Sequence, residues 1–134
     1  GEPDTMQNDP RYRNVRREVS SFLTERMRVA EAAGVNPDKI ILDPGFGFGK
    51  TVEHNVQLLA TLEQLHMLGH PLLIGLSRKS MLGAITGRDV NERLPASLAA
   101  ATISAMKGAS ILRVHDVRET VDAVKVVAAV KEAI

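Results

Sequence analysis

Three short apolar runs, each followed by glycine or charged residues, constrain this chain more than any other feature. The runs occupy residues 40–42, 72–74 and 111–114, and Arg113 interrupts the third. The first two are short and continuous, which is typical of strands that are buried on both faces of a parallel sheet. Because segments with helical spacing separate them, the sequence predicts a parallel α/β fold.

The helical segments set the order of the elements. Apolar residues recur at helical spacing over about 15–33, 52–68 and 96–106, with a short irregular stretch before the third helix. The last helix begins where Asp116 and Glu119 form an Asp-x-x-Glu capping box. This alternation fits either a doubly wound sheet or part of a (β/α)8 barrel. A closed barrel needs at least about 200 residues, so we expect these 134 residues, one unit without an internal boundary, to form only part of one.

Composition excludes several classes of protein. The formal net charge is +1, which leaves no basic surplus for binding nucleic acid or a membrane surface. The absence of cysteine excludes disulfides, thiolate nucleophiles and iron–sulfur clusters. No apolar run approaches the roughly 20 residues of a membrane-spanning helix, and no signal peptide opens the chain. The cytoplasm is therefore the expected compartment.

Each predicted strand ends in a cluster that can carry chemistry. The clusters are Asp-Pro-Gly-Phe-Gly-Phe-Gly-Lys-Thr (43–51), Gly-Leu-Ser-Arg-Lys-Ser (75–80) and Arg-Val-His-Asp (113–116). Binding groups in parallel α/β proteins gather at the carboxyl ends of the strands. We therefore expect the three clusters to form one shared site.

The first cluster is rich in glycine but matches neither common nucleotide-binding motif. A P-loop would need glycine where Pro44 stands, and a dinucleotide fingerprint would need glycine where Lys50 stands. Alternating glycines permit positive φ and a close approach to the backbone. Phe46 and Phe48, two of three phenylalanines in the chain, either pack back onto the sheet or contribute a ring that stacks on a flat ligand.

Three polar residues in the first and second clusters are candidates for ligand binding. Asp43 is either a turn residue or a carboxylate that accepts two parallel hydrogen bonds from an amidine-like ring edge. Lys79, with its neighbour Arg78, is either solvated or a donor to an anion or carbonyl oxygen. Ser80, at the start of a helical turn, can present its hydroxyl and backbone N–H to a carboxylate.

The third cluster predicts an anion site. Arg113 and His115 are two residues apart in the predicted strand, so both side chains would point to the same face. Together they suit a phosphate or pyrophosphate, whereas the simpler alternative is an internal ion pair between Arg113 and Asp43. No metal site can be assembled from protein residues, and the other histidines are expected at the surface: His54, His66 and His70.

These clusters together resemble dihydropteroate synthase. The matching segments are residues 43–50, 75–80 and 113–116, and the opening Gly-Glu-Pro-Asp-Thr-Met-Gln (1–7) is similar to the stretch after the fifth barrel strand of that family. The resemblance implies a (β/α)8 TIM barrel of the pterin-binding type, of which this chain is the C-terminal half with strands six to eight. It also implies a transferase of folate biosynthesis that joins 6-hydroxymethyl-7,8-dihydropterin pyrophosphate to 4-aminobenzoate and releases pyrophosphate.

The resemblance also assigns roles to residues. Asp43 would hold the pterin, and Lys79 would contact it and line the path to the reacting carbon. Arg113 would complete that pocket and receive the pyrophosphate together with His115. Mg²⁺, bound through the pyrophosphate, would assist its departure. The family pattern further implies that Gly75 of the second cluster contacts the substrate. It also implies that Phe48 and Ser80 contact 4-aminobenzoate, or the sulfonamide inhibitors that mimic it.

The same resemblance implies that much of the site is absent from this chain. The N-terminal half of the family supplies further pterin and anion ligands and the mobile loops. We therefore expect this polypeptide alone to be inactive or nearly so. Its unpaired parallel edges would favour aggregation or association with another copy, and the resemblance implies a homodimer, because the family dimerises through helices of this half. Three alternatives remain open: a pterin-dependent methyltransferase of the same fold, a non-catalytic half-barrel, and a nucleotide-binding protein that uses residues 49–51, which Pro44 disfavours.

Overall fold

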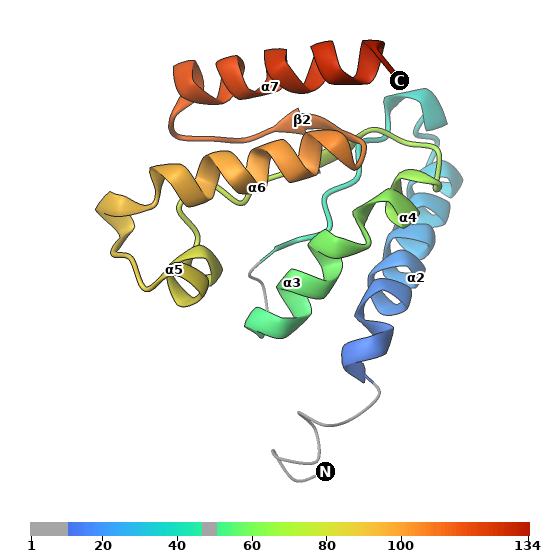
Figure 1. Cartoon of the computed structure of the whole chain (residues 1–134). Coiled ribbons are helices and arrows are strands. Elements are labelled where there is room, and N and C mark those ends of the chain that lie inside the picture. Colours follow the sequence, from blue (N-terminus) through green and yellow to red (C-terminus); the bar gives the residue numbers. More distant parts are fainter. Residues whose placement is uncertain (1–10, 47–50) are drawn as a thin grey trace, which may run out of the picture.

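Residues 11–46 and 51–134 are described by a computed structural model, with the backbone alone described for residues 11–16. Helices cover a small parallel sheet, with α6 and α7 side by side and α2 beside α3 (Figure 1). In chain order the helices, two of them short 3-10 helices (η), and the strands are α2 (Arg11–Ala32), η1 (Pro37–Lys39), α3 (Val52–Ala60), α4 (Leu62–His66), β1 (Leu72–Ile74), α5 (Ser80–Thr86), η2 (Val90–Glu92), α6 (Leu94–Met106), β2 (Ala109–Leu112) and α7 (Val117–Glu132).

The sheet confirms the predicted parallel pairing. Strands β1 and β2 are parallel, with Ile74 opposite Leu112. On the other edge of β1, Leu42 forms a single parallel bridge to Leu72, and its carbonyl accepts the N–H of Leu73 at 2.8 Å. The chain therefore contributes three adjacent segments that run in the same direction.

Two predicted strands differ from the observed ones. The run at 40–42 is reduced to the bridge at Leu42, and Ile41 is 52% exposed rather than buried. Among the described residues this segment pairs only with β1, so it lies at the edge of the sheet, where Ile41 stays exposed. Strand β2 begins at Ala109, two residues earlier than the predicted 111–114, because pairing with β1 sets its ends.

The helices also depart from the predicted pattern in two places. The predicted helix 52–68 is divided at Thr61, whose hydroxyl donates to the carbonyl of Gln57 at 2.9 Å. A threonine that hydrogen-bonds to the preceding turn bends a helix. The stretch expected to be irregular contains α5, which ends where Gly87 adopts φ +73°.

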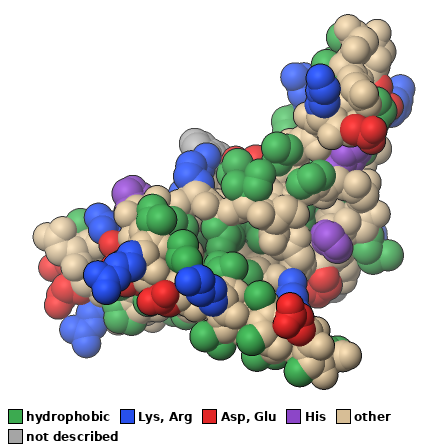
Figure 2. Space-filling model, turned by 90° about the horizontal axis from the view of Figure 1, so that it is seen from above, with side chains coloured by type: hydrophobic (Ala, Val, Ile, Leu, Met, Phe, Trp, Pro, Cys, Tyr) green, Lys and Arg blue, Asp and Glu red, His purple; other side chains and the backbone are tan. Residues whose placement is uncertain are grey.

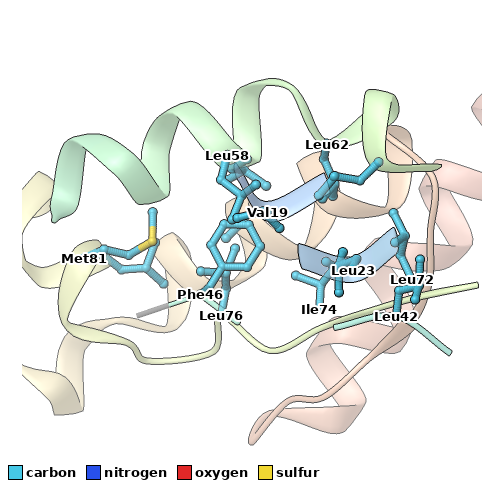
Figure 3. Close-up of a cluster of buried hydrophobic side chains, with 14 residues drawn as sticks. Val19, Leu23, Leu42, Phe46, Leu58, Leu62, Leu72, Ile74, Leu76 and Met81 are labelled. Atoms are coloured by element: carbon cyan, nitrogen blue, oxygen red, sulfur yellow. The ribbon is translucent and has the colours of Figure 1, made fainter. Parts of the chain in front are cut away.

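The core lies between the sheet and the helices, with Phe46 at its centre. Phe46 is 1% exposed and packs near Leu58 of α3, Met81 of α5 and Leu76, which follows β1 (Figure 3). For this ring the packing alternative is therefore confirmed. Phe48 lies outside the described residues.

Several apolar side chains remain exposed on the outer helices. Figure 2, seen from the α7 side, shows hydrophobic side chains between charged ones. Exposed residues of α7 include Val117, Val121, Val126 and Val130. In the described part of the chain, no helix combines the length and apolar character needed to cross a membrane.

Candidate functional site

Two groups of residues meet beyond the carboxyl ends of the paired segments. We call residues 42–46 the Asp43 segment, and residues 75–80 with 113–116 the β1–β2 rim. Arg113 Nη1 lies 3.9 Å from Asp43 Oδ2, and Lys79 Nζ donates to the Phe46 carbonyl at 2.6 Å. The structure therefore brings together clusters that are far apart in the sequence, as their places after successive strands predicted.

Asp43 fulfils the turn role and keeps part of its carboxylate for other partners. Its Oδ1 accepts the N–H of Gly45 at 2.9 Å, which closes the turn after the bridged residue. The pair with Arg113 is long, and the Arg113 side chain is 59% exposed. The predicted alternative of an ion pair is thus observed, but a contact this long and open leaves both groups able to bind a ligand.

The Arg113 guanidinium lies directly over Gly75. A Cβ placed on Gly75 would stand only 2.8 Å from Arg113 Cζ, and Gly75 itself is buried. A side chain at this position would push the guanidinium away. Gly75 therefore contributes space rather than a functional group to the rim.

His115 is oriented by Ser77, not by the pleat of a strand. The sequence places Arg113 and His115 on one face of a predicted strand, but β2 ends at Leu112 and both residues follow it. Instead the N–H of His115 donates to Ser77 Oγ at 3.2 Å, and Nδ1 lies 3.0 Å from the same oxygen. The Ser77 hydroxyl therefore holds the ring at its Nδ1 side, and it can either donate to that nitrogen or accept from it.

Lys79 and Ser80 follow where the chain enters α5. Lys79 directly precedes the helix, and its Nζ contact with Phe46 ties the rim to the Asp43 segment. Ser80 is the first residue of α5 and is exposed. Both residues therefore lie beside the other candidate ligands in the described part of the site.

Arg78 and Asp116 form an ion pair that the sequence did not predict. Arg78 Nη2 donates to Asp116 Oδ1 at 2.7 Å and Nε to Oδ2 at 3.3 Å. This guanidinium lowers the pKa of Asp116 below its usual range. Asp116 precedes α7, but its side chain makes no capping hydrogen bond, so the capping-box prediction is wrong in that respect. The adjacent charged positions in the two clusters were the available signal.

The remaining histidines do not join the site. Only His66 is exposed as predicted, whereas His54 and His70 are half-buried. Within the described ranges, no three His, Asp or Glu side chains gather into a group that could hold a metal ion.

Comparison with known proteins agrees with this geometry. The family model described as "Pterin binding enzyme" matches residues 1–115, and the chain belongs to this family of pterin-binding enzymes. Its relatives within the family include the dihydropteroate synthase of Escherichia coli (strain K12), which is 50% identical over 133 residues, 99% of this chain and 47% of that protein. The dihydropteroate synthase of Haemophilus influenzae is 49% identical over 126 residues, 94% of this chain and 46% of that protein.

Solved structures extend the agreement to the fold. The Yersinia pestis dihydropteroate synthase with a sulfonamide drug matches with a TM-score of 0.89 at 46% identity, covering 100% of this chain and 49% of that chain. The Xanthomonas albilineans enzyme in complex with 7,8-dihydropteroate gives 0.86 at 50% identity, covering 88% of this chain and 45% of that one. The predicted resemblance to dihydropteroate synthase and its pterin-binding barrel fold is confirmed. The chain spans about half the length of the curated relatives that it matches, 47% in the first case.

Proposed function

We propose that this chain supplies part of a dihydropteroate synthase, in which 6-hydroxymethyl-7,8-dihydropterin pyrophosphate and 4-aminobenzoate form 7,8-dihydropteroate and pyrophosphate. The observation that carries the proposal is the meeting of Asp43, Lys79, Arg113 and His115 at one edge of the sheet. In this assignment the chain is the C-terminal half of a (β/α)8 barrel, a single unit that contributes strands six to eight.

The charged residues of the site suit a transfer reaction in which pyrophosphate leaves as an anion. Asp43 would accept the amino and ring N–H groups of the pterin as parallel hydrogen bonds, and Lys79 would line the reacting carbon. Arg113 and His115 would hold the pyrophosphate as negative charge develops on it. No nucleophilic side chain is required: the amine nitrogen of 4-aminobenzoate forms the bond to the pterin methylene, pyrophosphate leaves with the electrons of the broken C–O bond, and the amine loses one proton to solvent.

Mg²⁺ belongs to this proposal as part of the substrate. Since the described residues offer no cluster of ligands, the pyrophosphate oxygens would hold the ion, which would supply charge neutralisation to the leaving group. The residues of this chain then need only bind the charged complex. Arg113 and His115 are the groups placed to do so.

Ser80 and Phe48 would contact 4-aminobenzoate. Ser80 is exposed beside Lys79 at the start of α5. The Yersinia pestis relative was solved as a complex with a sulfonamide drug, which supports sulfonamides as inhibitors that take this part of the site. The contribution of Phe48 rests on the family resemblance alone.

The assembly and location of the protein follow from the same assignment. We expect a homodimer, to which the exposed valines of α7 offer an apolar surface, and a cytoplasmic location as in folate biosynthesis. Sedimentation equilibrium measures the first: a mass of two chains is expected.

Ligand binding tests the proposal directly. We expect a pterin and Mg²⁺-pyrophosphate each to raise the Tm of the chain, since a ligand bound to the folded state stabilises it. Asp43→Asn should weaken pterin binding and Arg113→Ala pyrophosphate binding, each about tenfold or more. The exposed Asp38→Asn and Arg28→Ala are the matched controls and should change neither.

Each outcome separates the proposal from an alternative. Pterin binding without pyrophosphate binding would favour the methyltransferase, and binding of neither would favour the non-catalytic half-barrel. The pteroate assay on the 134-residue chain should give little or no turnover, because the ligands expected from the other half are missing. Robust turnover would overturn the assignment as a half-site.

A further inference from the structure

Two adjacent links join the two strands of the β1–β2 rim. Ser77 is bound to His115, and the next residue, Arg78, is bound to Asp116. The partners of each link are 38 residues apart in the sequence. Paired links of this kind fix both the separation and the direction of two loops, whereas a single contact would let them rotate.

Arg78 is held in an unusual backbone conformation. Its φ is +57°, in the left-handed region that residues other than glycine rarely adopt. Both of its backbone groups are bound from the same side of the fold. The N–H donates to Ser97 Oγ of α6 at 2.9 Å, and the carbonyl accepts Arg93 Nη1 at 3.0 Å. Such a conformation persists where the surrounding structure fixes it, and it marks functional sites.

Asp116 is fixed in turn by α7. Its carbonyl accepts both the N–H of Thr120 at 3.0 Å and the Thr120 hydroxyl at 2.7 Å. Its carboxylate is only 16% exposed and is free of the capping role, so it is directed at Arg78. The ion pair therefore connects a loop anchored on α6 to a loop anchored on α7.

We propose that Arg78 and Asp116 are positioning residues for the anion-binding part of the site, a role that rests on the proposed function. Lys79 follows Arg78 and His115 precedes Asp116, so the ion pair sets how these two groups face one ligand. The same ion pair binds the guanidinium of Arg78 to a carboxylate. Of the adjacent cations Arg78 and Lys79, Lys79 is the one whose side chain reaches the Asp43 segment.

The physical benefit is that positive groups are held together before the ligand arrives. Lys79 and Arg113 repel one another, and flexible loops would let them and His115 separate. A bidentate Arg–carboxylate pair is directional and resists this. A ligand that binds a preformed site loses less free energy to ordering the protein.

Two single variants and their combination test the proposal. Arg78→Asn removes the guanidinium, while asparagine tolerates the left-handed backbone. Asp116→Asn removes the charge with almost no change in size. The control is the nearby exposed pair, Arg88→Asn and Glu92→Gln, which joins residues of one segment at 3.9 Å.

Two measurements are made on each variant of the full chain. Amide hydrogen exchange at His115 reports on the links without any ligand. We expect exchange to quicken at least about fivefold in both rim variants, since the neighbouring link to Ser77 loosens. Calorimetric titration with Mg²⁺-pyrophosphate should show a Kd raised about tenfold, and the double variant should be no worse than either single variant.

Titration with 6-hydroxymethylpterin separates positioning from general damage. Its Kd should rise less than that of Mg²⁺-pyrophosphate, because its main proposed ligand, Asp43, lies on the other segment, whereas loss of folding would weaken both ligands alike. Unchanged exchange at His115 would overturn the proposal, as would altered exchange with an unchanged pyrophosphate Kd. If the unsubstituted chain binds pterin but no pyrophosphate, the proposed function is what fails, and the positioning role fails with it.

Discussion

The Asp43 segment and the β1–β2 rim carry neighbouring parts of the same site but are held by different forces. The Asp43 segment rests on burial: Phe46 lies in the core and Leu42 forms one bridge to β1. The rim rests on polar links, namely the ion pair of Arg78 with Asp116 and the contact of Ser77 with His115. A segment held by apolar burial keeps its position when the pH changes. Charged links orient the residues that they join, but they weaken when the pH changes the charge of a partner.

Among the described residues, two polar contacts and one apolar contact join the two regions. Lys79 Nζ donates to the Phe46 carbonyl, Arg113 Nη1 lies 3.9 Å from Asp43 Oδ2, and the Phe46 ring packs near Leu76 of the rim. A change in one region should therefore reach the other through these contacts. The following predictions test that separation, from the largest expected effect to the smallest.

Removing the buried ring should cause the largest loss. Phe46→Ala leaves a cavity in the core, and we expect the free energy of unfolding to fall by about 3–5 kcal/mol. Urea unfolding followed by circular dichroism measures it. Phe22→Ala is the control, because Phe22 is 63% exposed and its loss should cost less than about 0.5 kcal/mol. Equal losses in the two variants would contradict burial as the anchor of the Asp43 segment.

Filling the space under Arg113 should affect binding more than stability. In Gly75→Ala the new Cβ meets the end of a flexible side chain, so the free energy of unfolding should change by less than about 1 kcal/mol. Displacement of the guanidinium should raise the pyrophosphate Kd about tenfold. In an Arg113→Ala background the same substitution should have no further effect on Kd, and an additional loss there would contradict the steric explanation.

Acid should loosen the rim when it protonates Asp116. Arg78 holds the pKa of Asp116 below its usual range, so the folded state binds this proton less readily than the unfolded state. The stabilisation is therefore complete above about pH 4, the ordinary carboxyl range, and is lost as the pH falls through the lowered pKa. Exchange at His115 should quicken only in that acidic window. In Asp116→Asn the quicker exchange should already be present at neutral pH, and a constant difference between the variants at all pH values would contradict the link.

An exposed ion pair outside both regions should give the smallest effect. Lys107 Nζ lies 2.8 Å from Glu63 Oε2 and lowers the pKa of Glu63, but the Glu63 side chain is half exposed. Glu63→Gln should therefore lower the free energy of unfolding by no more than about 0.5 kcal/mol and leave ligand binding unchanged. A loss comparable with that of Phe46→Ala would show that surface charge contributes far more to this fold than the comparison allows.

Local patterns predicted the framework well. Apolar spacing located α2, α6 and β1 closely, and strand ends located the three clusters that meet. The errors lie where local and distant interactions compete. Pairing with β1 moved β2 to Ala109–Leu112, and the hydroxyl of Thr61 divided the helix between α3 and α4.

The site divides in the same way. The identities of Asp43, Lys79, Arg113 and His115 as candidate ligands follow from residue types at strand ends, and the motifs that contain them identify the family. The burial of Phe46 was one of two interpretations that the sequence left open. The ion pair of Arg78 with Asp116 was not predicted, since Asp116 was interpreted as a capping residue.

The sequence by itself determined which residues reach the site, because strand periodicity, helix ends and turn residues depend on neighbours within a few positions. Only the tertiary structure decided how those residues are held. Whether Asp116 caps α7 or binds Arg78 depends on a partner 38 residues away, and a carboxylate takes the stronger, charged hydrogen bond when folding brings it within reach.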